Sequence, residues 1–304
     1  MNYKRFIKSQ SLRFAILHSL EWVPDSIMLR VQYRIKNGRW PNLKHPTRYT
    51  EKLQLYKMKY RNPVLQQCVD KYEVRRYVES KGLGHILNNL YGVFDSAEQI
   101  DFSVLPERFV IKSTSGGGGS NVIVVKDKST LDVGETYKTI SKWLSNSSGQ
   151  INAGREWAYS GIKKTRIIIE EYLEEKKSGD LARPLTDYKF FCFNGIPYFL
   201  YVVTDRIPGI SAAFGIYDMD FNKLPYYRAD ELPQKTIEQK PQNYEEMVEI
   251  ARILSKEFPH VRVDLYNVRG KIYFGELTFY DGSGYFSYNP DSFDLEVGRY
   301  FTEY

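Results

Sequence analysis

The chain has 304 residues, of which 42% are hydrophobic and 15% aromatic, so it can bury a full core and exceeds the usual size of one domain. Its two cysteines, Cys68 and Cys192, lie far apart without metal-ligand spacing, and there are only four histidines, which argues against a disulfide framework or a structural zinc. The sequence shows neither a membrane span nor a signal peptide, and it predicts a soluble cytoplasmic protein.

Positive charge is concentrated at the N-terminal end. Residues 1–62 contain 14 Lys and Arg against three acidic residues, a net charge of +11, whereas the whole chain is +6. Basic and apolar side chains interleave over residues 1–35, which is typical of amphipathic helices. We interpret residues 1–62 as a basic helical arm that binds an anionic membrane surface or an acidic polymer. The alternative is an arm packed on the body, with its cations in solvent.

Two helices are predicted next, over residues 49–60 and 64–80, between prolines that punctuate the segment. We assign residues 63–108 as a helical lead-in to the body of the protein. The strands begin after it.

A glycine-rich loop connects two short strands, 109–112 and 122–125. Consecutive glycines let backbone amides approach phosphate oxygens, and Lys112, at the end of the first strand, adds a positive charge. The order of residues fits neither a Walker A loop nor a dinucleotide fingerprint. A flexible hairpin connection is the alternative interpretation. The four glycines are Gly116, Gly117, Gly118 and Gly119.

A buried strand is predicted at 166–173, after a helix at 131–144 and a polar linker at 145–154. Two further strands, 188–193 and 198–203, form a hairpin around Asn194-Gly195. The segregation of strands and helices indicates an α+β fold.

A helix at 244–258 leads into a second hairpin at 261–280, whose polar residues all occur in one phase. A three-residue loop would put the apolar residues on a common face and place Glu276 almost directly across from Arg262. Asp264 and Thr278 then share that polar face. Carboxylates beside a guanidinium suit magnesium and phosphate. The alternative is a solvated face that carries charges for solubility.

Taken in order, these motifs resemble those of the ATP-grasp superfamily, and more closely its TupA-like branch, which is associated with bacterial cell-surface polysaccharide loci. The resemblance extends from residue 40 to residue 285. It implies an ATP-grasp fold, in which two α+β lobes hold ATP between them, with a glycine-loop lobe at 109–166 and a metal and acceptor lobe at 167–304. The matching segments are Asp70-Lys71-Tyr72, Leu105-Pro106, Phe109–Lys112, Ile167–Leu173, Asp187–Gly195, Arg262-Val-Asp264, Glu276-Leu-Thr278 and Gly282-Ser-Gly284.

ATP and Mg²⁺ are the cofactors that the resemblance implies. Lys71 and Lys112 would bind phosphate together with the loop glycines. The adenine edge would pair with the backbone of a hinge that follows the buried strand. The residues assigned to this hinge region are Glu170, Glu171, Tyr172 and Leu173.

The remaining roles fall on the second lobe. Asp187 would hold the ribose hydroxyls, with Glu174 and Glu175 as competing candidates. Lys189 and Arg206 would act on the phosphate groups, and Arg262 would stabilise negative charge on an acyl phosphate or tetrahedral intermediate. The residues that would hold the metal are Asp264, Glu276 and Thr278. The superfamily commonly has Glu-x-Asn in this last motif, so Thr278 leaves the number of Mg²⁺ ions open.

The resemblance implies an ATP-dependent ligase that joins a carboxylate to an amine through an acyl phosphate. For this branch we expect an amide between a sugar carboxylate, such as a uronic acid, and an amino acid or similar amine, in surface polysaccharide synthesis. A kinase, a glycosyltransferase and a non-catalytic nucleotide-binding module are the alternatives. Asp218-Met-Asp220 is the only Asp-x-Asp sequence that would serve a glycosyltransferase.

The expected partners are a sugar carboxylate or glycan acceptor and an amine donor. The basic arm could also dock the protein on a lipid-linked glycan or on the inner face of the membrane. Nucleic acid is not an expected partner, because no segment resembles a nucleic-acid-binding module. The sequence leaves the oligomeric state open.

Overall fold

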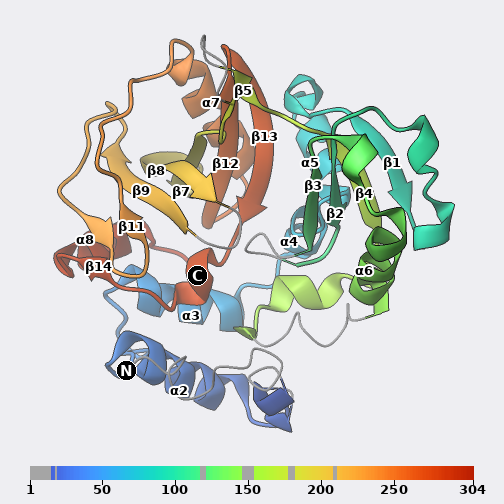
Figure 1. The fold of residues 1–304 in the computed structure, drawn as a ribbon. Helices are drawn as coiled ribbons and strands as arrows, with labels where there is room; N and C mark the ends of the chain where they lie inside the picture. The colour runs from blue at the N-terminus through green and yellow to red at the C-terminus, as the bar shows by residue number, and fades with distance from the viewer. Residues whose placement is uncertain (1–14, 18, 117–120, 146–153, 177–181, 208–210) are drawn as a thin grey trace.

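A computed structural model describes residues 15–17, 19–116, 121–145, 154–176, 182–207 and 211–304. Two α+β lobes stand side by side, each built on its own sheet, and helices α2 and α3 lie below them (Figure 1). The α+β fold with two lobes is therefore confirmed. No helix among the described residues is long and apolar enough to cross a bilayer.

The smaller lobe contains a four-stranded antiparallel sheet in the order β1-β4-β2-β3. One face packs against α6 (Val133–Ser145) through a core that includes Ile111, Ile140 and Ile169. Because side chains alternate along a strand, Lys112 and Glu170 point the other way. The strands are β1 (Leu90–Phe94), β2 (Phe109–Ser113), β3 (Val122–Val125) and β4 (Ile167–Glu171).

This sheet corrects the predicted boundary between residues 166 and 167. Strand β4 pairs with β1 on one side and β2 on the other, so it lies inside the smaller lobe. Strand β1 comes from the segment that we had assigned to the helical lead-in. The smaller lobe therefore extends from β1 to the end of β4, and the chain crosses to the larger lobe after Glu171.

The larger lobe contains a six-stranded sheet in the order β11-β9-β8-β7-β12-β13. Its pairs are antiparallel except β11 with β9. Helix α7 (Tyr244–Ser255) contacts β7, β8 and β12, while α8 (Ser292–Tyr300) packs against α3 (Tyr49–Lys59). The strands are β7 (Asp187–Phe193), β8 (Ile196–Ile207), β9 (Ser211–Asp218), β11 (Leu232–Pro233), β12 (His260–Val268) and β13 (Lys271–Thr278).

One face of the larger sheet is aromatic at one end of β7 and β12 and charged at the other. At one end, His260 lies opposite Phe193 in a buried aromatic cluster with Tyr49 and Phe301. Two and four residues further along β12, Arg262 and Asp264 follow on the same face. The rigid aromatic end therefore anchors the strand pair that carries the charged end.

The hairpin between β12 and β13 differs from the prediction. Val268 pairs with Lys271, so the loop has two residues, and both of them, Arg269 and Gly270, have positive φ angles of 54° and 81°. This is the backbone geometry of a tight turn that matches strand twist. An irregularity after Asp264 then shifts the register by one residue. The four polar residues still share a face, because the bulge compensates for the shorter loop.

The corrected register changes the cross-strand pairs. Asp264 lies opposite Glu276, and Arg262 lies opposite Thr278. The prediction had placed Glu276 across from Arg262. A side chain at Gly275, in the bulge, would put its Cβ 2.9 Å from the Asp264 carbonyl oxygen. The bulge therefore needs glycine at this position.

The predicted helix over residues 64–80 is two helices, α4 (Pro63–Cys68) and α5 (Glu73–Ser80). The Asp70 carboxylate accepts hydrogen bonds from the amides of Tyr72 and Glu73, at 2.8 and 2.9 Å, and so starts a new helix. The amide of Lys71, in the break, donates to the Thr114 carbonyl at 3.0 Å. The break brings Lys71 to the glycine loop.

The basic N-terminal segment is not one separate arm. Helix α3 is largely buried, and its Tyr49, Leu53 and Tyr56 belong to the main hydrophobic core. Helix α2 (Asp25–Asn37) lies on the far side of α3 from the two sheets, at the lower side of the molecule (Figure 1). The predicted boundary at residue 62 thus runs through a region that packs with the larger lobe. The part of the predicted amphipathic helices that precedes residue 15 lies outside the described residues.

Short elements complete the described fold. The short strands are β5 (Glu175–Lys176), β6 (Ala182–Arg183), β10 (Tyr227–Arg228) and β14 (Tyr288–Asn289). The 3₁₀ turns are Gly84–Ile86, Ala97–Gln99, Phe102–Val104, Lys128–Thr130, Trp157–Gly161 and Asp281–Gly284.

Replacing Gly275 by Ala should destabilise the protein by roughly 1–3 kcal/mol, because the added methyl group meets backbone that cannot move without changing the register. Urea denaturation measures the effect. Gly134→Ala, at the start of α6, is the matched control, because the added Cβ there meets nothing closer than 3.5 Å. Equal unfolding midpoints for the two variants would contradict the bulge assignment.

Candidate active site

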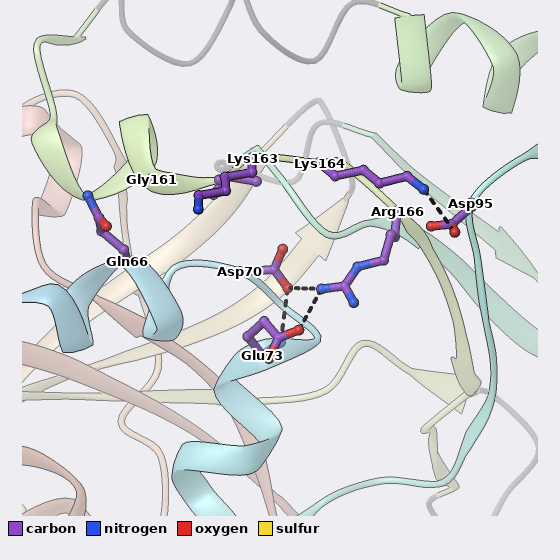
Figure 2. Close-up of a pocket in the computed structure, with 9 residues that line it drawn as sticks. Gln66, Asp70, Glu73, Asp95, Gly161, Lys163, Lys164 and Arg166 are labelled. Carbon is purple, nitrogen blue, oxygen red and sulfur yellow. Dashed lines mark hydrogen bonds and ion pairs between the residues drawn. The ribbon is translucent and has the colours of Figure 1, made fainter.

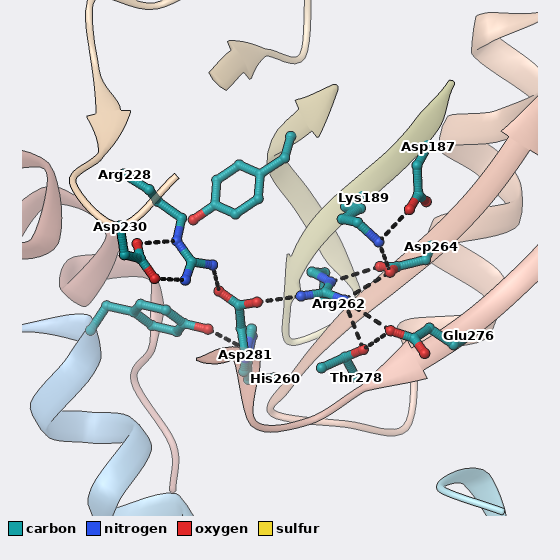
Figure 3. A network of polar contacts seen from close by, with 12 residues as sticks. Asp187, Lys189, Arg228, Asp230, His260, Arg262, Asp264, Glu276, Thr278 and Asp281 are labelled. Atoms are coloured by element: carbon teal, nitrogen blue, oxygen red, sulfur yellow. Dashed lines mark hydrogen bonds and ion pairs between the residues drawn. The ribbon is translucent and has the colours of Figure 1, made fainter. Parts of the chain in front are cut away.

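Ion pairs link charged side chains on β7 and β12 in the larger lobe (Figure 3), and a further pair connects them to Arg206 on β8. The Lys189 ammonium lies 2.7 Å from Asp187 Oδ2 and also contacts the Asp264 carboxylate. Arg206 reaches the same Asp187 oxygen at 3.1 Å. The second oxygen of Asp187 is buried and has no hydrogen-bond partner among the described residues. It is a buried acceptor that a ligand hydroxyl could satisfy.

Arg262 is the centre of the charged cluster. Its Nε and Nη2 atoms donate to the two oxygens of Asp264 at 2.7 and 2.8 Å, a bidentate pair. Nη2 also donates to Glu276 and to Thr278, at 3.0 Å each, and Nη1 contacts Asp281. Burial lowers the pKa of Arg262, but these carboxylates outweigh it and raise the pKa well above its ordinary value. The guanidinium is a permanent charge held in a fixed orientation.

The two carboxylates predicted to hold metal differ in their surroundings. Burial raises the pKa of Asp264 to about 6, against the opposing effect of Arg262 and Lys189. Burial also raises the pKa of Glu276, but Lys189, Arg262 and the Thr278 hydroxyl outweigh it and bring the value to about 2. Glu276 is thus ionised at any physiological pH, and 48% of its side chain is exposed. Glu276 is therefore the more accessible of the two carboxylates, because the Asp264 side chain is only 2% exposed.

Two lysines, Lys112 on β2 and Lys71 in the turn between α4 and α5, lie near each other beside the glycine loop. Lys112 Nζ lies 2.7 Å from Glu170 Oε2, and Arg75 approaches the other oxygen of Glu170 at 3.4 Å. Lys71 donates to the Gly116 carbonyl at 2.5 Å. Burial lowers the pKa of Lys71, while the negative charge of Glu276 opposes that change. This interaction links the turn between α4 and α5 to the charged cluster of the larger lobe.

The glycine loop is described as far as Gly116, which has a φ of 98° that favours glycine. Gly117, Gly118 and Gly119 lie outside the described residues. Their assignment to phosphate stays a prediction.

The hinge residues at the end of β4 differ in how far protein contacts already occupy them. The Glu171 amide donates to the Asn89 carbonyl at 2.9 Å, and its carboxylate accepts from the Asn89 side chain at 2.9 Å. Glu170 is buried in its ion pairs. Any pairing of the hinge amides with adenine therefore falls to Tyr172 and Leu173. Glu174, a rival for the ribose, forms an ion pair with Arg108.

These residues fit ATP and Mg²⁺. Mg²⁺ is commonly held by one or two carboxylates together with phosphate oxygens, and the opposed pair Asp264 and Glu276 supplies two. Thr278 donates to Glu276 Oε1 at 2.9 Å, so in this structure it orients the carboxylate. Among the described residues, no three His, Cys, Asp or Glu side chains converge as a metal site. Phosphate oxygens would complete the coordination.

A family model described as TupA-like ATP-grasp matches residues 51–302. The chain belongs to the TupA-like ATP-grasp family. The match includes both lobes and most of α3, and it covers every predicted site residue. A search of curated proteins finds no match.

Several solved structures overlap this ATP-grasp protein at low identity. D-alanine–D-alanine ligase from Bacillus anthracis is 15% identical, with 70% of this chain and 57% of that chain covered and a TM-score of 0.43. The same enzyme from Helicobacter pylori is 15% identical, with 78% of this chain and 60% of that chain covered and a TM-score of 0.42. L-amino acid ligase from Bacillus licheniformis is 14% identical, with 78% of this chain and 48% of that chain covered and a TM-score of 0.43. The chain spans about half the length of these structures.

A separate pocket of about 470 Å³ lies beside the turn that carries Lys71 (Figure 2). Arg166 pairs with Glu73 at 2.8 Å, approaches Asp70 at 3.7 Å and lies over the Tyr72 ring at 4.6 Å. These contacts hold the Asp70-Lys71-Tyr72 turn, so Arg166 helps to position Lys71 at the glycine loop.

Sequence reasoning missed Asp281 and Arg228. Asp281 is buried, contacts Arg262 with one oxygen and accepts from Arg228 Nη1 with the other at 3.2 Å. Arg228 also forms an ion pair with Asp230, in which Nη2 lies 2.7 Å from Oδ2 (Figure 3). Asp281 stands directly before the Gly282-Ser-Gly284 motif, which was a usable signal. Arg228 had none, because it comes from a distant strand.

Lys57 on α3 is a third missed residue. It is 1% exposed, and its ammonium donates to the Ser283 carbonyl at 2.8 Å and lies 4.4 Å from the centre of the Tyr285 ring. Burial lowers its pKa to about 7, while Glu156 opposes the change. Ser283 has a φ of 57°, a left-handed conformation that costs free energy in a residue other than glycine. Lys57 stabilises that turn.

The Asp-x-Asp sequence does not lie in this cluster. Both oxygens of Asp218 accept hydrogen bonds from Asn222, at 2.7 and 3.0 Å, within the turn after β9. This is a structural role, so the feature that favoured a glycosyltransferase is accounted for.

Asp281→Asn should lower the kcat for phosphate release from Mg-ATP by about 10–100-fold, because Arg262 loses the charge that orients its Nη1 side. KM for ATP should change little, since Asp281 lies behind Arg262. Asp230→Asn is the matched control, because its side chain is 45% exposed and its ion pair within the described part of the chain is with Arg228. It should alter kcat by less than about threefold. An Asp281→Asn enzyme with the kcat of the control would disprove the positioning role.

The free energy of unfolding should rise between pH 7 and 10.5 relative to a Lys57→Met variant. The folded-state pKa of Lys57 is about 7 and the unfolded value is 10.5, so the unfolded chain binds more protons in this window. The penalty for burying the charge is present in full below pH 7 and fades as the pH rises. Urea denaturation at several pH values measures the difference. A difference that does not change with pH would mean that Lys57 titrates normally.

Proposed function

We propose that the protein is an ATP-dependent carboxylate–amine ligase that forms an acyl phosphate and transfers the acyl group to an amine. The observation that carries the proposal is the electrostatic contact between the lysines beside the glycine loop and the charged cluster of the larger lobe. Lys112 comes from the smaller lobe, and Lys71 comes from the turn between α4 and α5, where its amide donates to the Thr114 carbonyl. Glu276, which interacts with Lys71, comes from the larger lobe and pairs there with Arg262. Membership of the ATP-grasp family supports the same assignment.

The roles follow from the geometry. Lys71 and Lys112 would neutralise the phosphate groups from one side, and Lys189 and Arg206 would do so from the other. Mg²⁺, when bound by Asp264 and Glu276, would offset the charge of the transferring phosphoryl group. Arg262, fixed by four neighbours, stabilises the negative charge that develops on the carboxyl oxygen without having to reorganise. No protein nucleophile is needed.

We further propose that the carboxylate belongs to a sugar, such as a uronic acid in a surface polysaccharide, and that the amine is an amino acid or a similar compound. The association of the TupA-like branch with cell-surface polysaccharide loci, which the resemblance of the motifs implies, is the support for this substrate class. The buried Arg228 beside the Gly282-Ser-Gly284 turn adds a cation next to the reaction centre, which suits an anionic acceptor.

A screen of uronic acids paired with amino acids, scored by ATP turnover, tests the proposal. A ligase releases free phosphate only when both substrates are present, and hydroxylamine traps its acyl phosphate as a hydroxamate. Product that retains the phosphoryl group would identify a kinase instead. Turnover of a UDP-sugar without ATP would identify a glycosyltransferase.

Glu276→Gln should lower substrate-dependent ATP turnover by about 10²–10³-fold and raise the Mg²⁺ concentration required, because the ionised and accessible carboxylate is lost. Glu245→Gln is the matched control, since this α7 side chain is 79% exposed and pairs only with Lys240 among the ion pairs of the described residues. Wild-type turnover by Glu276→Gln would refute the metal assignment.

A further inference from the structure

Helix α2 has two apolar faces, and one of them is exposed to solvent. Met28, Leu29 and Tyr33 are buried against the body. Ile27 and Ile35, on the other side, are 52% and 41% exposed. A third exposed residue, Val31, lies between them at a spacing of four, so the three form one stripe along the helix. In Figure 1 the helix lies at the lower edge of the molecule, away from the two sheets.

An exposed tryptophan lies close to each end of this helix. Trp22, before the first turn, is 79% exposed, and Trp40, after the last, is 63% exposed. An indole ring combines a large apolar surface with one hydrogen-bond donor, so it suits the boundary between lipid headgroups and acyl chains. The two tryptophans, together with the stripe of Ile27, Val31 and Ile35, are here called the α2 face.

Cations border the α2 face. Arg30 and Arg34 are exposed and lie three and seven residues after Ile27, which places them directly beside the stripe. The nearest acid in the helix, Asp25, is paired with Arg155 at 2.8 Å. Residues 1–62 carry 14 basic side chains against three acidic ones. The charge around the stripe is therefore complementary to an anionic surface.

We propose that the α2 face docks the protein on a bilayer that contains anionic phospholipid. The helix lies flat on the surface, because Met28, Leu29 and Tyr33 hold its opposite side to the body. The apolar stripe and the two tryptophans enter the headgroup boundary, while Arg30 and Arg34 bind lipid phosphates.

Two other occupants fit less well. A second copy that used the same face would bring Arg30 and Arg34 of both copies together at a symmetric interface, which is repulsive. A soluble acidic polymer would satisfy the arginines but would leave the apolar stripe and the tryptophans exposed to water.

Sedimentation with vesicles tests the proposal on the full chain. Vesicles of phosphatidylcholine are compared with vesicles that also contain phosphatidylglycerol. The protein should bind the second kind, and added salt should weaken the binding. The double variant Ile27→Asp/Val31→Asp should bind at least about tenfold more weakly, because two apolar side chains no longer enter the boundary.

A second variant keeps the test decisive if the first fails to fold. Arg30→Gln/Arg34→Gln should weaken binding to the anionic vesicles by about fivefold for each lost cation and should reduce its salt dependence. Val104→Asp and Lys138→Gln are matched controls at exposed sites in the smaller lobe and should bind like the wild type. Phosphate release from Mg-ATP should be unchanged in all four variants.

Three results would overturn the proposal. The first is the absence of binding to the anionic vesicles. The second is equal binding by the α2-face variants and their controls. The third is a dimer in lipid-free solution that the Ile27→Asp/Val31→Asp variant dissociates, because it would identify a second copy as the occupant.

Discussion

The buried guanidinium of Arg262 is the constraint on which the rest of the site depends. A charge removed from water costs several kcal/mol unless it is fully paired, and breaking such a pairing costs about 3–5 kcal/mol. Arg262 satisfies the requirement with Asp264, Glu276, Thr278 and Asp281. These partners come from two strands and the following turn, so the pairing fixes the hairpin, its bulge and the turn together.

On the same sheet face, an aromatic end packs in the core and a charged end forms the site. The aromatic end around His260 is closed by α3 and α8, and burial lowers the pKa of that imidazole to about 4, so it packs as a neutral ring. The charged end begins two residues later at Arg262. A strand period of two puts both ends on the same side, and the packed end holds the charged end still. Preorganised charge is what phosphoryl transfer requires of a protein.

Local patterns in the sequence predicted most of the elements that carry the site. Alternation identified β7, β12 and β13, and the polar phase identified Arg262, Asp264, Glu276 and Thr278 as one face, which the register confirms. The loop length was wrong, because Arg269 adopts a positive φ that is unusual for a residue other than glycine. The bulge at Gly275 offset that error, so the face was right although the cross-strand pairs were not.

Other features depend on contacts that no local pattern encodes. The sequence of β4 has the same apolar pattern whether the strand begins one lobe or completes the other. Only its pairing with β1 and β2 shows that it belongs to the smaller lobe. Arg228 is brought to Asp281 by the packing of distant strands. The break before α5 had a local cause, the cap made by Asp70, but the periodicity of the surrounding residues masked it. Family resemblance supplied the roles of Lys71 and Lys112, which their own surroundings did not reveal.

The central claim is that Lys71 and Lys112, beside the glycine loop, and the carboxylates of the larger lobe form one Mg-ATP site. A crystal structure with a non-hydrolysable ATP analogue and Mn²⁺ tests it most directly, because the anomalous signal of manganese locates the metal. The account predicts manganese bound by Glu276 and Asp264, with the phosphate groups beside Lys71 and Lys112. Nucleotide bound elsewhere, or manganese away from both carboxylates, would contradict it.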